Sequence, residues 1–175
     1  MTVVIGARGI INNVNAFVKQ LAQISEKRNL VVQAFDAKAV YGKEHLRSAT
    51  FHAKRAFKQK SNSTNSLALE IMLYASGERQ IQKALQKMGV KKGKQQIAFA
   101  ATNDATRKKN SCLDETLMKE LLRVFSLNSD DSVLKGNRNT LKLFGITDLE
   151  LSTTPQSRYG DLILEKVALV DVMKK

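Results

Sequence analysis

The sequence contains one cysteine, Cys112, and one proline, Pro155, among its 175 residues. A single thiol cannot form an internal disulfide and supplies too few ligands for a thiolate zinc site, so we expect Cys112 to be an inert thiol. No apolar run reaches the roughly 20 residues of a membrane-spanning helix. No basic leader precedes the short apolar patch at the N-terminus, which argues against a signal peptide. We therefore expect a cytoplasmic protein that does not associate with membranes.

Acidic residues are also scarce. The sequence has 16 Asp and Glu residues against 29 Lys and Arg residues, which gives a formal net charge of +13. A balance this basic points to a polyanionic partner, nucleic acid above all. Lysine enrichment for heat stability is the alternative, but it usually brings Glu with it. Because 43% of the residues are hydrophobic, the chain can bury a core, and its length suits one domain covering residues 1–175.

Catalytic and metal-binding motifs are missing as well. The Gly6-Ala7-Arg8-Gly9 segment lacks the Gly-Lys-Ser/Thr ending of a P-loop and the third glycine of a dinucleotide site. His45 and His52 have no acidic or thiol companion on their expected helix face, which argues against a bound metal. No serine stands in a nucleophile elbow. We therefore expect a protein that is not an enzyme and holds neither metal nor cofactor.

Residue periodicity predicts a few short strands among several helices. Strands are expected at Val3–Ile5, which Gly6 and Gly9 would end, at Leu30–Phe35 and at Gln95–Ala101. Asn12 or Asn13 can cap the first helix, and Pro155 suits the first turn of the last one. The segment Leu169–Val172 could be helix or strand. Helices are expected over 14–24, 43–58, 66–74, 78–88, 116–125 and 137–144, and after Pro155 through Ala168. This pattern indicates an α+β fold, a small sheet covered by helices, with a parallel βαβ sheet as the alternative.

The most informative segment joins two helical patterns of opposite character. Ser66–Tyr74 is apolar on every side except at Glu70, so this helix must be buried and Glu70 must be paired with a cation or a backbone amide, or else face a partner. Glu78–Met88 is amphipathic, with its cations four residues apart. A helix N-terminus with free amides, nearby cations and an aromatic ring suits a phosphate and an unstacked base. The candidate RNA-binding residues are Tyr74, Ser76, Gly77, Arg79, Gln80, Lys83 and Lys87.

A DNA-binding helix-turn-helix over the same two helices is the rival interpretation. The second helix speaks against it, because Ile81, Ala84 and Leu85 stand where base-reading side chains would be polar.

The last helix carries more apolar residues than one buried stripe needs. Leu162, Ile163, Val167 and Ala168 form a stripe, and Leu164, Leu169 and Val170 lie off it. A surplus apolar face on a highly charged protein indicates a partner surface. The alternative is that both faces are buried, one of them under a tail strand.

Several segments together resemble a known family. They are Phe35-Asp36-Ala37, Gly42-Lys43-Glu44-His45, Asn65-Ser66-Leu67-Ala68-Leu69-Glu70-Ile71, Ala75-Ser76-Gly77-Glu78-Arg79-Gln80-Ile81, Ala84–Val90 and Leu164–Val170. The chain resembles the small kinase-associated subunit of the KEOPS complex, the Cgi-type or TPRKB-like family of PRPK-binding proteins. The resemblance implies an α+β fold with a mostly antiparallel sheet and a non-catalytic, regulatory role.

The resemblance also implies specific partners. A family member would bind a PRPK-type small kinase/ATPase, here through Leu164, Val167 and Ala168. Through that kinase it would act with the threonylcarbamoyl transferase that modifies tRNA, and it would hold the single-stranded CCA end of the tRNA.

Overall fold

The computed structural model describes residues 2–103, 113 and 115–173. Cys112 and the polar, basic stretch after Asn103 lie outside these residues. The sheet has four strands in the order β2-β3-β1-β4, every neighbouring pair antiparallel. The strands are β1 (Thr2–Ile11), β2 (Leu30–Asp36), β3 (Gly93–Asn103) and β4 (Asn128–Ser129). The α+β prediction and the antiparallel sheet are confirmed, and the parallel alternative is wrong.

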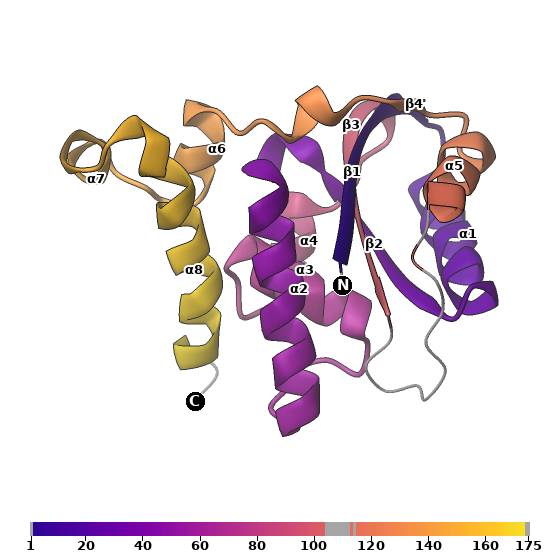
Figure 1. Cartoon of the computed structure of the whole chain (residues 1–175), viewed down its shortest axis with the longest axis horizontal. Coiled ribbons are helices and arrows are strands. Elements are labelled where there is room, and N and C mark those ends of the chain that lie inside the picture. Colours follow the sequence, from indigo (N-terminus) through magenta and orange to yellow (C-terminus); the bar gives the residue numbers. More distant parts are fainter. Residues whose placement is uncertain (1, 104–112, 114, 174–175) are drawn as a thin grey trace.

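Helices cover both faces of this sheet (Figure 1). Phe35 and Ala98 point to a core with the central helices, whereas Ala34 and Phe99 point to a second core under α1 and α5. Because side chains alternate along a strand, this gives a helix–sheet–helix arrangement. The helices are α1 (Val14–Lys27), α2 (Gly42–Gln59), α3 (Leu67–Ser76), α4 (Ile81–Met88), α5 (Glu115–Val124), α6 (Arg138–Leu143), α7 (Asp148–Thr153) and α8 (Tyr159–Met173), with the 3-10 turns η1 (Ala37–Ala39), η2 (Asp131–Leu134) and η3 (Gln156–Arg158).

The first strand is longer than the sequence suggested. Gly6 and Gly9 were expected to end it, but both lie inside β1. A Cβ on Gly6 would overlap the carbonyl oxygen of Asp130, and one on Gly9 would overlap the side chain of Leu127. The two glycines therefore let the segment around β4 and η2 cross close to β1, a use of glycine that the local sequence does not reveal.

Two helix expectations also need correction. The helix expected from Glu78 begins at Ile81, because Gly77 to Gln80 form the turn that ends α3. Pro155 does not open the last helix but precedes η3, which leads into α8. The segment Leu169–Val172, expected as helix or strand, is the helical end of α8, so the alternative of a tail strand over α8 is wrong. No helix among the described residues is long and apolar enough to cross a membrane.

Candidate nucleic-acid and partner interfaces

The Ser76-Gly77 turn lies at the C-terminal end of α3, not at the head of α4 as the sequence suggested. Gly77 has a φ of 68°, the left-handed conformation that glycine adopts most easily. Its N–H donates to the Tyr74 carbonyl oxygen, and the Glu78 N–H donates to that of Leu73. The amides of α4 begin only after Gln80, whose side chain makes no cap hydrogen bond. The backbone N–H groups of Gly77 and Glu78 are therefore used within the turn, and the first helix amides without such a partner follow at Ile81.

Two of the candidate RNA-binding residues are buried. The Tyr74 hydroxyl donates a hydrogen bond to Asp171 of α8, and its ring stacks on His52 with 5.7 Å between ring centroids. Burial, followed by the bond to Asp171, raises the pKa of this phenol. Ser76 is also fully buried and donates to the Leu73 carbonyl oxygen. A base could not stack on Tyr74 without opening the core.

The cations of the expected stripe divide between the surface and the interior. Arg79 and Lys83 are exposed, as is Gln80. Lys87 turns inward: its Nζ donates to the Ser76 carbonyl oxygen over 2.7 Å, lies 3.2 Å from Glu78 Oε1 and is 4.1 Å from the ring centroid of Phe144. Burial lowers the pKa of this ammonium. The four-residue spacing suggested one surface, but α6 and the chain after it cover the last of the three cations.

Glu70 binds the loop that precedes its own helix. Its carboxylate accepts hydrogen bonds from the N–H groups of Ser63 and Thr64 at 3.1 and 3.0 Å, and from the Thr64 hydroxyl at 3.0 Å. The side chain is fully buried. The prediction of a backbone-amide partner is thus confirmed, and the partner-interface alternative does not fit a residue without exposed surface. Glu70 positions the Ser-rich loop over 61–66.

The outer face of α8 is apolar over its second half. Val167 is fully buried in the core with Ile163 and Val170, whereas Leu164 is half-buried and Ala168 exposed. The next turn adds Leu169 and Val172, the latter 65% exposed. Of the three predicted partner residues, Leu164 and Ala168 therefore lie at the surface and Val167 does not.

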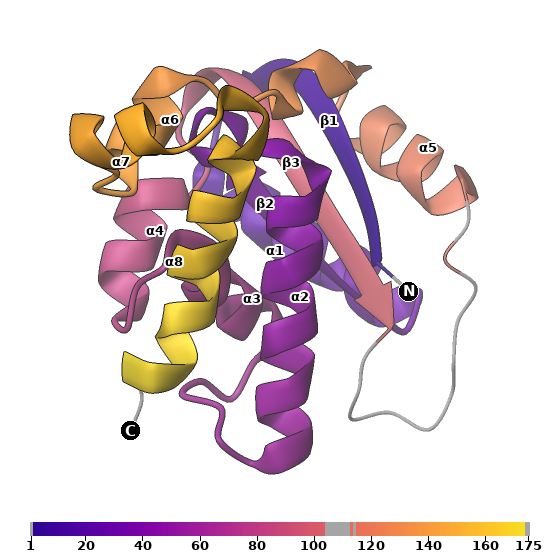
Figure 2. The ribbon, with the colours of Figure 1, turned by 60° about the vertical axis from the view of Figure 1, so that its left-hand side comes forward.

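Helix α2 extends this apolar face. Asp171 of α8 accepts a hydrogen bond from Arg55 and lies 2.9 Å from His52 Nδ1, which fixes α8 alongside α2 (Figure 2). Burial of Asp171 opposes ionisation, but its hydrogen bonds from Tyr74, His52 and Arg55 outweigh that effect and lower its pKa. Phe51 of α2 is 63% exposed beside this cluster. Phe51 was not predicted from the sequence; its signal is an aromatic residue outside the buried apolar stripe of α2, which consists of Leu46, Ala49, Ala53 and Ala56.

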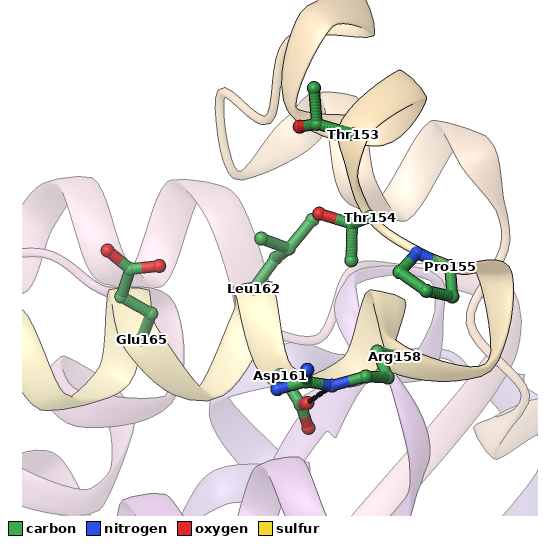
Figure 3. A pocket seen from close by; sticks show the side chains of 7 residues that line it. All are labelled: Thr153, Thr154, Pro155, Arg158, Asp161, Leu162 and Glu165. Atoms are coloured by element: carbon green, nitrogen blue, oxygen red, sulfur yellow. Dashed lines mark hydrogen bonds and ion pairs between the residues drawn. The ribbon is translucent and has the colours of Figure 1, made fainter.

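A shallow hollow of about 230 Å³ lies at the other end of α8 (Figure 3). Leu162 lies at its centre, with Thr154 and Pro155 on one side and Glu165 on the other. Arg158 and Asp161 form an ion pair of 2.8 Å at its edge. The described residues include no group of three His, Cys, Asp or Glu side chains that could hold a metal ion.

Comparison with known proteins identifies relatives of the whole chain. A family described as kinase binding protein CGI-121 matches residues 9–171. The regulatory protein Cgi121 of Methanocaldococcus jannaschii is 28% identical over 149 residues, which span 83% of this chain and 87% of that protein. The matched region includes the α3–α4 turn, α2 and most of α8.

Proposed function

Because this chain belongs to the CGI-121 family of kinase-binding proteins, we propose that it is a non-catalytic, cytoplasmic subunit that binds the PRPK-type kinase/ATPase of a KEOPS complex. The apolar face of α8 and α2 supports this proposal most directly. The kinase-binding surface consists of Phe51, Leu164, Ala168, Leu169 and Val172. Its aromatic and aliphatic residues flanked by Arg55 have the composition of a protein interface core. The threonylcarbamoyl transferase would be reached indirectly, through the kinase.

Co-elution with the purified kinase tests this surface. Leu169→Asp places a charge in the proposed interface and should abolish co-elution, because a charge desolvated without a partner is costly. Leu149→Asp is the matched control: Leu149 is 74% exposed on α7, outside the surface, and its variant should bind like the wild type. Equal binding by both variants would contradict the proposed surface.

The second part of the proposal is that the subunit also holds the single-stranded CCA end of tRNA. Arg79, Gln80 and Lys83 are exposed beside the Gly77 turn, where cations and backbone groups can bind phosphates. Leu85, 44% exposed on α4, offers apolar contact for a base in place of the buried Tyr74. Lys87 and Ser76 would act by holding the turn.

Binding of tRNA with and without its single-stranded 3′ end tests this part. Removing the tail should weaken binding more than changing the anticodon does. Arg79→Glu with Lys83→Glu should weaken binding of intact tRNA and flatten its salt dependence, since a protein that neutralises fewer phosphates releases fewer counterions. Tail-independent binding would contradict the CCA-end proposal.

The burial of α3 does not favour the DNA-binding alternative. The first helix of a helix-turn-helix crosses the DNA backbone, but Glu70 and Ile71 to Ser76 of α3 are all buried.

A further inference from the structure

We propose that a second basic surface, formed by η1, α4 and α6, binds the phosphate backbone of the paired acceptor arm next to the tRNA's 3′ end. This inference rests on the tRNA part of the proposed function and deepens it. The basic track consists of Lys38 of η1, Lys83 of α4, Lys92 before β3, Lys135 after η2 and Lys142 of α6, all of them exposed. It shares Lys83 with the candidate CCA site.

The elements that bear these lysines are in contact with one another. The 3-10 turn η1 contacts α4, α6 and η2. The Thr140 hydroxyl of α6 donates to the carbonyl oxygen of Lys38, and Lys91 lies 3.8 Å from Asp36 at the start of η1. Lys87 of α4 lies over Phe144 at the end of α6. The elements that carry the track therefore lie next to one another, and α4 connects them to the candidate CCA-binding turn.

Charge is divided unevenly over this side of the molecule. Residues 81–94 and 135–145 contain eight Lys or Arg residues and no Asp or Glu, whereas residues 148–173 contain five Asp or Glu and two Lys or Arg. Among the described residues, none of the five lysines of the basic track makes an ion pair, so their charges are not neutralised within that part of the protein. A polyanion is thus attracted to α4 and α6 and repelled from α7 and α8, and α8 carries most of the proposed kinase-binding surface.

The track offers charge without stacking platforms. Phe144 is buried beneath Lys87, and Gly136 packs against the ring of Tyr41. Single-stranded RNA is usually bound with its bases stacked on exposed aromatic rings, whereas paired RNA presents phosphates whose bases already stack on each other. A surface built from five lysines fits the paired arm of the tRNA, not its tail.

Two triple charge reversals of equal size test the proposal. The track variant is Lys38→Glu, Lys135→Glu and Lys142→Glu. The control variant is Lys19→Glu, Lys27→Glu and Arg123→Glu, on α1 and α5 across the sheet, where these exposed cations also make no ion pair in the described structure. The probes are intact tRNA and a short single-stranded RNA ending in CCA. Melting temperatures check that both variants fold.

The track variant should bind intact tRNA at least about tenfold more weakly and reduce its salt slope by about 0.9 for each phosphate that it no longer neutralises. It should bind the short RNA like the wild type, and the control variant should bind both RNAs like the wild type, since screening limits distant charge effects. Equal losses of affinity in the two variants, an equal loss for the short RNA, or no loss at all would overturn the proposal. Failure of the CCA-end proposal is distinct, because there the wild type would bind tRNA equally well without its tail.

Discussion

The Lys87 ammonium donates a hydrogen bond of 2.7 Å to the carbonyl oxygen of Ser76. Carbonyl groups in the last turn of a helix have no partner within the helix and carry partial negative charge. Lys87 therefore caps the C-terminal end of α3 from the neighbouring helix, while its contact with Phe144 ties α6 to the same point. The Lys87 side chain therefore stabilises the turn from the protein interior and does not face solvent.

The first prediction separates the roles of two lysines on α4. Lys87→Met should lower the free energy of unfolding by about 1–3 kcal/mol, because a charged hydrogen bond to a nearly buried carbonyl is removed. Lys83→Met should change it by less than about 0.5 kcal/mol, as for most surface substitutions. Urea denaturation measures both, and wild-type stability of Lys87→Met would contradict the capping role.

The second prediction concerns Glu70 and the loop it holds. Glu70→Gln should destabilise the protein by about 1–3 kcal/mol, because the neutral amide weakens the bonds from Ser63 and Thr64 to Oε2 and replaces Oε1, which also accepts from the Ser63 N–H, with an NH2 group that cannot accept. Hydrogen exchange of the Ser63 and Thr64 amides should accelerate by more than that of distant amides. Unchanged exchange at these two amides would show that Glu70 does not hold the loop.

The third prediction concerns pH. Burial, then the Lys87 charge, lower the pKa of His45 to about 4, against the opposing effect of its bond to Ala75. The imidazole lies 2.7 Å from the Ala75 carbonyl oxygen and accepts from the Tyr41 N–H at 3.1 Å. Only the neutral ring can do both, so protonation breaks the Tyr41 bond.

The pKa of His45 is lower in the folded state than its unfolded value of 6.5. The contribution of the neutral ring to the free energy of unfolding is therefore fully present above pH 6.5 and is lost as the pH falls toward about 4. The loss should reach about 3 kcal/mol. Free energies of unfolding measured across this range should fall steeply for the wild type and less for His45→Gln, which has no titrating ring. Parallel curves for the two proteins would refute the assignment.

Local patterns were sufficient for elements whose stabilising contacts are local. Asn13 caps α1 by accepting from the Ala16 N–H, and the helix expected over 43–58 is α2, Gly42–Gln59. Helix α7 was missed although Thr147 and Glu150 form a capping box, a signal that the sequence does contain.

The remaining features depend on segments that meet only in the folded chain. The length of β1 depends on the segment around Asp130, and the direction of Lys87 depends on Phe144, 57 positions further along. The spacing of cations along α4 cannot reveal a cover that comes from α6. The candidate RNA-binding site therefore remains at the predicted segment, but Tyr74, Ser76 and Lys87 do not face solvent as the sequence suggested.

The last prediction uses two adjacent residues of α8, one buried and one exposed. Val167 is fully buried in the core, and Ala168 is exposed on the proposed kinase-binding surface. Val167→Asp should cost more than about 3 kcal/mol, since it places an unpaired carboxylate in the core. Ala168→Asp should cost about 0.5 kcal/mol, the difference in helix propensity, and should leave a cooperatively folding protein that still binds tRNA but no longer co-elutes with the kinase. Thermal unfolding, tRNA binding and co-elution are measured for both variants. Kinase binding by Ala168→Asp at wild-type strength would place the interface elsewhere, and a folded, stable Val167→Asp would contradict the packing of α8 against α2 and α3.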